Sequence, residues 1–329
     1  MKNWFVLLLS FMAALILFFV LTIFYEQSTP QKLELDTPIP IVLKSRMVEP
    51  MEFWDVVHRG IYEAAKEYGI DVKISGPLYE KEIDQQIEIV EAILNEHPPL
   101  LVLSATDYVK LVSTVEKADK MGIPVITIDS GVDSDIPVSF IATDNIAAGE
   151  KAGLELLRLL ENKENPKIAI VSHIKEAASA IDREAGVRKA LAGENIVGTW
   201  YCDVEEDRAY EITKELIDTY DLDGIVALNE VSSLGVARAV DEYQVKDALV
   251  VVAFDNAIRE LAFLESGVIK ATVVQRPYNM GYMTVKIAVD YLKGEDVPDF
   301  LDTQSVLITQ ENMFQREYQE LLYPFSNAE

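Results

Sequence analysis

Cysteine is nearly absent from this chain. Cys202 is the only cysteine among 329 residues, which excludes an internal disulfide and a cysteine-rich metal site. The three histidines, His58, His97 and His173, are scattered without the spacing of metal ligands. Glycine and proline are also few, at 15 and 13 residues, whereas hydrophobic residues make up 50% of the chain. This composition argues against a disordered or fibrous protein, and the length suits two globular domains.

Positive charge is scarce as well. Lysine and arginine number 29 against 55 aspartate and glutamate residues, so the formal net charge at pH 7 is −26 and the pI is about 4.5. A chain this acidic repels the phosphates of nucleic acids and of anionic lipid headgroups. We therefore expect no nucleic-acid partner.

The motifs of several common enzyme classes are missing. The sequence contains no G-x-S-x-G nucleophile elbow, no G-x-x-x-x-G-K-S/T phosphate loop and no G-x-G-x-x-G fingerprint. A pair of carboxylates for glycoside hydrolysis could be drawn from the acidic residues, but no sequence feature distinguishes such a pair. These absences favour a binding protein over an enzyme, with neither a cofactor nor a metal.

One hydrophobic run is long enough to span a membrane. Trp4–Tyr25 contains 22 uncharged residues, which as a helix would rise about 33 Å, and Lys2 precedes it. A cleaved signal peptide is the alternative, but small residues usually follow such a peptide, and here Phe24–Gln27 follows. We expect residues 1–26 to be a single-pass membrane anchor, residues 27–37 to be a linker, and the rest of the chain to lie outside the cytoplasm.

Beyond the linker, short apolar runs alternate with segments of helical periodicity, and the pattern restarts after Asp144. The alternation predicts an α/β protein with two doubly wound, Rossmann-like lobes joined by a hinge of several short connections. We expect residues 38–144 and 277–304 to form the N-terminal lobe, and residues 145–276 and 305–329 to form the C-terminal lobe. Within the second lobe, a helix is expected over Ala185–Leu191.

Three apolar runs in the second half each end at a polar residue. Asn229, Asp255 and Gln275 follow the runs that close at Leu228, Phe254 and Val274, respectively. Because open α/β sheets bind ligands beyond the carboxyl ends of their strands, these side chains are expected to converge on one crevice. Their hydrogen-bonding groups predict a polar, neutral, hydroxyl-rich ligand.

Four segments carry a resemblance to a known family. The chain resembles the type I periplasmic sugar-binding proteins, similar to ribose- and xylose-binding proteins and related to the ligand domain of the LacI family, from Pro38 to about Phe314. The segments are ATDNIAAGEKAG (Ala142–Gly153), ALNEVSSLGVARAV (Ala227–Val240), VVAFDN (Val251–Asn256) and ATVVQRPYNMGYMTV (Ala271–Val285). The resemblance implies a type I periplasmic binding protein fold. The DNA-binding headpiece of LacI repressors is missing.

The resemblance also implies a set of ligand residues. Phe53 and Trp54 are the expected stacking pair, and Arg46 or Lys44 a polar contact from the first loop. Asp129 is implied as an acceptor, although Ser130 stands where an arginine is common. The remaining implied positions lie in the second lobe: Arg183, Asn229, Asp255, Gln275 and a wall formed by residues 200–203.

Each of these positions has a structural alternative. Asp129 could cap a turn, Asp255 could cap the helix near Ala257, and Asn229 could cap the following helix with Ser232 as a rival. Because adjacent helical residues do not share a face, only one of the two aromatic residues would stack on the ligand.

Arg183 also has a structural alternative to the ligand contact that the resemblance implies, and some other residues are interpreted as structural only. Arg183 could pair with Glu184 or Glu176 at the surface, and His173 and Cys202 are expected to be ordinary packing residues. The acidic runs Tyr79–Asp84 and Asp203–Asp207 are expected to be solvated.

The predicted anchor suggests how a bound monosaccharide, a pentose or a hexose, would be used. Tethering holds the binding lobes near one membrane partner and raises their effective concentration there. The sequence-based hypothesis is a sensor that reports the sugar to a membrane histidine kinase of a two-component system. The alternative is the substrate-binding component of a sugar ABC transporter that delivers sugar to its permease.

Overall fold

The computed structural model describes residues 12, 15–19, 33, 35–45 and 52–323. The predicted anchor (residues 1–26) and linker (residues 27–37) lie mostly outside these residues, and Arg46 lies outside them entirely. Among the residues that are described, no helix combines the length and the apolar character needed to cross a membrane.

The first lobe is built on a six-stranded, wholly parallel sheet in the order β11-β5-β4-β3-β1-β2. Its strands are β1 (Ile39–Val42), β2 (Val72–Ser75), β3 (Leu101–Leu103), β4 (Val125–Ile128), β5 (Ser139–Ala142) and β11 (Phe300–Asp302). Helices α2 (Glu52–Tyr68) and α10 (Pro277–Leu292) pack on one face. Helices α3 (Ile83–Asn95) and α4 (Val112–Lys120) cover the other, so the sheet is buried between two helical layers.

The second lobe repeats this plan with the order β12-β10-β9-β8-β6-β7, in which only β12 is antiparallel to its neighbour. Its strands are β6 (Lys167–Ser172), β7 (Asn195–Tyr201), β8 (Gly224–Ala227), β9 (Val250–Phe254), β10 (Ala271–Gln275) and β12 (Ser305–Thr309). Helices α5 (Asn145–Leu159) and α6 (Ala178–Ala190) cover one face. The other face is covered by α7 (Glu206–Thr219), α8 (Glu230–Glu242), α9 (Ile258–Glu265) and α11 (Arg316–Leu322).

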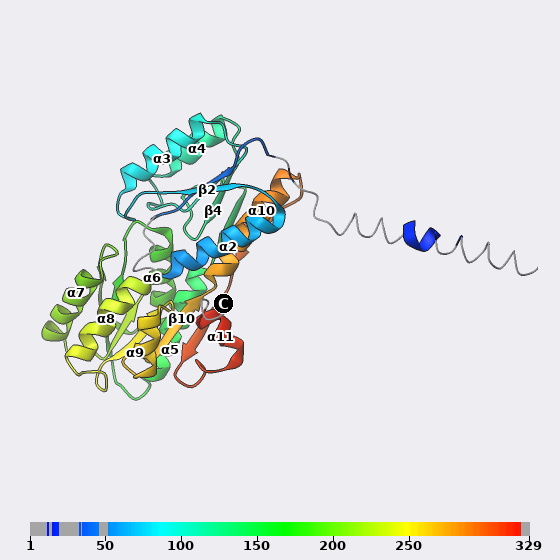
Figure 1. The fold of residues 1–329 in the computed structure, drawn as a ribbon. Coiled ribbons are helices and arrows are strands. Elements are labelled where there is room, and N and C mark those ends of the chain that lie inside the picture. The colour runs from blue at the N-terminus through cyan, green and yellow to red at the C-terminus, as the bar shows by residue number, and fades with distance from the viewer. Residues whose placement is uncertain (1–11, 13–14, 20–32, 34, 46–51, 324–329) are drawn as a thin grey trace, which may run out of the picture.

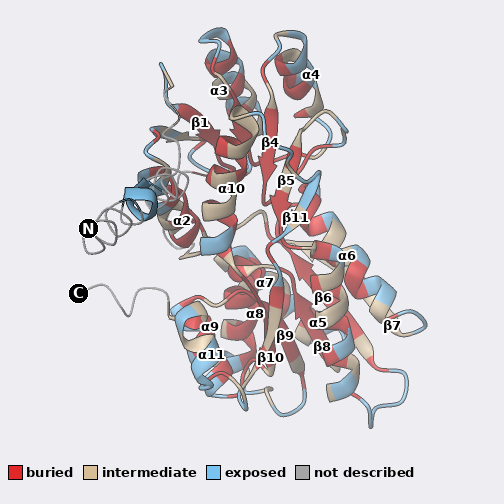
Figure 2. Ribbon diagram, turned by 90° about the vertical axis from the view of Figure 1, so that its right-hand side faces the viewer, coloured by how far each residue is buried: buried red, intermediate tan, exposed pale blue. Residues whose placement is uncertain are grey.

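The chain passes between the lobes three times, after β5, after β10 and after β11, and each connection is short. Figures 1 and 2 show the resulting arrangement, with one lobe above the other. Hydrogen bonds tie the connections together: Thr143 Oγ1 donates to Gln275 Oε1 at 2.9 Å, and Asp144 N donates to Asp302 Oδ1 at 3.0 Å. The structure therefore confirms two doubly wound α/β lobes joined by a hinge of several segments.

Helix α6 begins at Ala178, seven residues before the predicted start at Ala185. The sequence signal was weak because this part of the helix buries the small residues Ala178 and Ala180 and a charged residue, Arg183. Such a face has no stripe of large apolar side chains for periodicity to detect.

Candidate functional site

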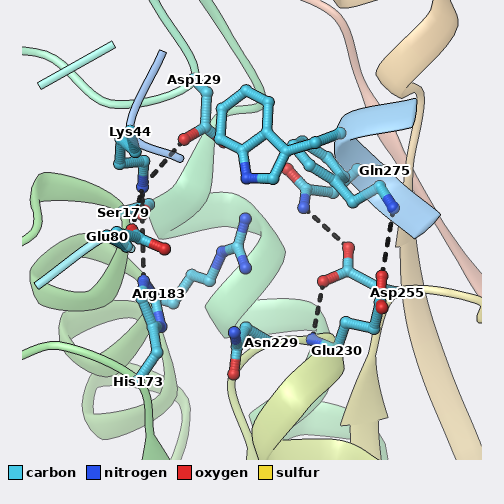
Figure 3. A pocket seen from close by; sticks show the side chains of 12 residues that line it. Lys44, Glu80, Asp129, His173, Ser179, Arg183, Asn229, Glu230, Asp255 and Gln275 are labelled. Carbon is cyan, nitrogen blue, oxygen red and sulfur yellow. Dashed lines mark hydrogen bonds and ion pairs between the residues drawn. The ribbon is translucent and has the colours of Figure 1, made fainter. Parts of the chain in front are cut away.

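A pocket lies between the two lobes, at the carboxyl ends of strands from both sheets (Figure 3). Polar and aromatic side chains of both lobes line it: Lys44, Phe53, Trp54, Glu80, Asp129, His173, Ser179, Arg183, Asn229, Glu230, Asp255 and Gln275. The space that protein atoms leave there, solvent-open space included, is about 390 Å³. Side chains of both lobes close around this small space, which suits one small molecule.

Seven of the eight predicted ligand residues line this pocket, and the eighth, Arg46, lies outside the described residues. The predicted wall at residues 200–203 is wrong. Trp200 packs against Tyr220 with 6.0 Å between ring centroids, and Cys202 is buried in the core of the second lobe, where burial raises its pKa to about 11.

The aromatic residues Phe53 and Trp54 both line the pocket, and that only one of them stacks on a ligand stays a prediction. They lie in the first turn of α2, and their rings meet edge to face, with centroids 5.1 Å apart and planes at 83°. The rule that adjacent residues face different directions applies to the sides of a helix. The pocket lies at the end of this one, so two neighbouring side chains reach it.

Lys44 follows β1 and is buried between two carboxylates. Its Nζ lies 3.0 Å from Glu80 Oε1 and 3.0 Å from Asp129 Oδ2, and all three residues are at most 6% exposed. Burial by itself lowers the pKa of Lys44, but Asp129 and Glu80 outweigh this and raise its pKa above the ordinary value. Lys44 therefore supplies the positive charge beside Asp129, where Ser130 carries none.

Glu80 corrects the expectation that the run Tyr79–Asp84 is solvated surface. Its carboxylate points inward to Lys44, whereas its neighbour Lys81 is exposed. The sequence could not show this because the ion pair joins loops after two different strands, 36 residues apart in the chain.

Asp255 sits at the end of β9 and accepts two hydrogen bonds. Gln275 Nε2 donates to Oδ1 at 2.7 Å, and the backbone N–H of Glu230 donates to Oδ2 at 3.0 Å. The carboxylate therefore meets the N-terminus of α8 and not that of α9, which the capping alternative had proposed. Its position is fixed by both neighbours before any ligand is considered.

Asn229 serves as the N-cap of α8. Its Oδ1 accepts from Ser232 N at 3.0 Å, while Ser232 Oγ accepts from Asn229 N at 3.1 Å, so the two supposed rivals share one capping box. Among the described residues, nothing accepts a hydrogen bond from Asn229 Nδ2. Capping uses the oxygen end of the amide and leaves the nitrogen end for a ligand.

Arg183 is 3% exposed and held by the second lobe. Its Nε donates to Asn145 Oδ1 and its Nη1 to Leu228 O, both at 2.8 Å, and its guanidinium carbon lies 4.8 Å from the Phe254 ring centroid. The surface alternative is wrong, because Glu184 pairs instead with Arg188. Figure 3 shows the guanidinium in the middle of the pocket.

Close packing of α5 against α6 sets the position of Arg183. A Cβ atom added to Gly149 of α5 would lie 2.2 Å from the Arg183 carbonyl oxygen, far inside van der Waals contact. Glycine at this position is therefore what allows the helix that carries Arg183 to approach so closely.

His173 and Ser179 form the rear of the pocket next to Lys44. Ser179 Oγ lies 3.4 Å from His173 Nε2 and 3.5 Å from Lys44 Nζ. Burial, followed by the charges of Lys44 and Arg183, holds the pKa of His173 well below its usual value, so the imidazole is neutral at neutral pH. His173 is thus a pocket residue, although the sequence had suggested only a packing role.

On the side of the pocket away from Lys44, three carboxyl groups lie close together: those of Glu230, Asp255 and Glu260. Burial, followed by the nearby Asp255, raises the pKa of Glu230 to about 8. Glu260, fully buried behind Asp255, accepts a hydrogen bond from Thr272 Oγ1 at 2.9 Å, and burial raises its pKa well above the usual range. Glu230 is therefore mostly protonated at neutral pH.

The pocket combines flat aromatic rings with many fixed donors and acceptors. The rings can cover apolar C–H faces, carboxylates accept hydrogen bonds, and guanidinium and amide nitrogens donate them. Sequence reasoning missed Glu80, Ser179 and Glu230 and undervalued His173. Position after a strand was the signal used: His173 directly follows β6, and Glu230 lies next to Asn229, so both carried this signal, whereas Glu80 and Ser179 did not.

Known proteins share this architecture. A family model described as "Periplasmic binding protein domain" matches residues 48–296. The D-allose-binding periplasmic protein of Escherichia coli K12 is 26% identical over 275 residues, covering 78% of this chain and 88% of that protein. The ribose import binding protein RbsB of Bacillus subtilis 168 is 25% identical over 260 residues, which cover 78% of this chain and 83% of that protein.

Solved structures agree. The chain is similar to a carbohydrate transporter solute binding protein from Agrobacterium radiobacter in complex with D-arabinose, with a TM-score of 0.82 and 31% identity, covering 88% of this chain and all of that one. It is also similar to a sugar transporter from Clostridium phytofermentans, with a TM-score of 0.77 and 33% identity. The match covers 83% of this chain and 99% of that one.

Proposed function

The chain belongs to the periplasmic binding protein domain family, with its type I fold, and we propose that it binds a monosaccharide outside the cytoplasm and presents it to a membrane partner. The pocket between the lobes supports this proposal, because the two aromatic residues share it with many polar, hydrogen-bonding side chains. Relatives named for D-allose and ribose, and a similar structure holding D-arabinose, support a pentose or hexose as ligand.

Each type of side chain in the pocket would make a different kind of contact with the sugar. Phe53 and Trp54 cover the C–H faces of the sugar ring, while Asp129 and Asp255 accept hydrogen bonds from hydroxyl groups. Arg183 donates, with two of its nitrogens already held by the protein. A hydroxyl of the wrong configuration would leave one buried group unpaired at a cost of about 1–3 kcal/mol, which selects among epimers.

Closure of the two lobes would link the binding of a sugar to recognition of the protein by its membrane partner. The three short connections let the lobes rotate as units, and a sugar that contacts both lobes favours the closed form. We propose that the first lobe comprises residues 38–144 and 277–304 and the second residues 145–276 and 305–329. The hinge then lies where the strands β5, β10 and β11 end.

Import is the function that the comparisons favour. The relatives include ribose import binding proteins, and several similar structures are solute-binding proteins of ABC transporters. We therefore propose that the partner is the permease of a sugar ABC transporter. Binding without catalysis follows, because these relatives are named for sugar binding and transport.

Sensing is a second candidate function, and the sequence of Trp4–Tyr25 motivates it. An uncharged run of this length predicts a single-pass anchor, and a tethered binding protein would remain beside one membrane partner such as a histidine kinase. Deletion of the gene separates the two roles: loss of sugar uptake supports import, whereas loss of sugar-induced transcription with normal uptake supports sensing.

Calorimetric titration of residues 27–329 with D-allose, D-ribose, D-arabinose, D-fucose and related sugars tests the binding function directly. We expect one sugar to bind tightly and the binding to be lost in Asp255→Ala. No binding by any pentose, hexose or polyol would overturn the proposal.

A further inference from the structure

Glu230 reaches across the cleft from the second lobe to the first. It is the first residue of α8, and its carboxylate accepts hydrogen bonds from two backbone groups of α2, from Glu52 N to Oε1 at 3.1 Å and from Phe53 N to Oε2 at 3.2 Å. The first N–H groups of a helix have no partner within the helix, so the oxygens of the Glu230 carboxyl group satisfy two donors that would otherwise need another acceptor. A side chain of one lobe thus caps a helix of the other.

Glu52 makes the reciprocal contact. It is the first residue of α2, and its Oε2 accepts a hydrogen bond at 3.2 Å from the N–H of Ile258, the first residue of α9 in the second lobe. The two lobes therefore exchange helix caps through Glu52 and Glu230.

The helix that Glu230 caps is the one that carries the aromatic pair. Phe53 donates its N–H to Glu230 and Trp54 is the next residue, so the contact fixes the first turn of α2 from which both rings enter the pocket. Both carboxylate oxygens of Glu230 are occupied by α2. The side chain can thus act on a ligand through α2 even though it borders the pocket.

We propose that Glu230 is a positioning residue that links closure of the lobes to placement of the aromatic pair Phe53–Trp54 on the sugar. The proposal rests on the sugar-binding function above. When the lobes open, the caps separate and the first turn of α2 is released. When they close, the caps form and the rings take their places.

An ion pair also bridges the lobes, but it lies in different surroundings from the two helix caps. Lys81 of the first lobe pairs with Glu205 of the second, and both side chains are 52% exposed. Solvent screens such a pair, so it contributes little. Glu230 is 3% exposed, and the loss of its two hydrogen bonds is therefore expected to matter more.

The test compares Glu230→Ala and Glu230→Gln with Glu265→Gln, a control at an exposed glutamate of α9. Sugar dissociation is followed by stopped-flow fluorescence. The lobe separation is measured by electron–electron resonance between nitroxide labels at the exposed positions Lys120 and Glu215, with and without sugar.

Glu230→Ala is expected to raise the sugar dissociation rate roughly 10- to 30-fold, since two part-buried hydrogen bonds between the lobes are lost, and to reduce the closed population even without sugar. Glu230→Gln keeps one acceptor oxygen, so its sugar dissociation rate and closed population should lie between those of Glu230→Ala and the wild type. In Glu265→Gln both quantities should match the wild type.

Two results overturn the proposal: an unchanged closed population in Glu230→Ala, or a sugar affinity that falls while the lobe distances stay as in the wild type. The second would make Glu230 an ordinary sugar contact. If Glu230→Ala does not fold, Glu230→Gln and Glu52→Gln carry the same comparison. Failure of the wild type to bind any sugar overturns the binding function instead, while the lobe distances without sugar still decide whether the caps hold the closed form.

Discussion

Asp129 and Asp255 occupy equivalent places in the two lobes. Each directly follows a central strand, β4 or β9, and each has a positive backbone φ, 60° and 77° respectively. Each also donates its N–H to a carbonyl of the neighbouring strand, to Ile141 O at 2.9 Å and to Val273 O at 3.0 Å. The repeated turn brings one carboxylate from each lobe to the same pocket, and asparagine and aspartate tolerate this conformation better than most residues.

Substitutions at Asp255 should separate its charge from its backbone role. Asp255→Asn keeps a residue that tolerates positive φ but leaves one acceptor oxygen for two protein donors, so we expect sugar affinity to fall roughly 10- to 100-fold and stability to fall by about 1 kcal/mol. Asp255→Ala should lose affinity, both hydrogen bonds and about 1 kcal/mol more from backbone strain, so its loss of stability should be the larger. Calorimetry and thermal unfolding measure the two effects, and equal stability losses in both variants would contradict this assignment.

Removing Lys44 should destabilise the first lobe. Lys44→Met leaves Glu80 and Asp129 buried without their cation, and breaking such a buried pair costs about 3–5 kcal/mol. The double variant Lys44→Met/Glu80→Gln should recover part of that loss, because one uncompensated charge is gone. Urea unfolding provides the measurement. As a control, Lys81→Met in an exposed ion pair should leave stability close to that of the wild type.

Gly149→Ala should displace the helix that carries Arg183. The added Cβ would meet the Arg183 carbonyl oxygen at 2.2 Å, so α6 must move, at a cost of about 1–3 kcal/mol in stability and with weaker sugar binding. Gly131→Ala is the matched control, since its Cβ would meet Phe140 at an ordinary 3.6 Å. Unchanged affinity in Gly149→Ala would show that Arg183 does not depend on this contact.

Sugar affinity should depend on pH through Glu230. In this structure, in which its carboxyl group reaches α2 of the other lobe, burial and Asp255 raise the pKa of Glu230 to about 8, whereas exposed glutamate has a value of 4.5. We take this conformation, with the caps made, as the closed form. The groups that face it are acidic: Glu52 from α2, Asp255 after β9 and Glu260 from α9. A raised pKa means that the closed form holds the proton more tightly than the open form.

The closed, sugar-bound form is therefore favoured fully below pH 4.5, and this advantage is lost as the pH rises to about 8. Within this window we expect affinity to fall by at most about tenfold per pH unit. Calorimetric titrations between pH 5 and 9 measure how steeply sugar affinity falls with pH, and in Glu230→Gln the affinity should depend less on pH. An affinity that rises with pH in the wild type would contradict the assignment.

The amino-acid sequence by itself determined the fold class and much of the site. Alternation of short apolar runs with helical periodicity predicts two parallel-sheet lobes, because each strand must be buried on both faces and each helix on one. Polar residues at the carboxyl ends of strands, such as Asn229, Asp255 and Gln275, were predictable because the ends of parallel strands meet at one edge of a sheet.

Only the tertiary structure decided which charges meet. Lys44 and Glu80 are brought together by the pairing of two strands, and Glu230 meets Glu52 across a cleft, 178 residues away in sequence. Local sequence carries no signal for such contacts, since an acidic residue in a polar run looks the same whether it faces water or a buried lysine. Burial then gives these groups their altered pKa values, and burial is a property of the folded chain as a whole.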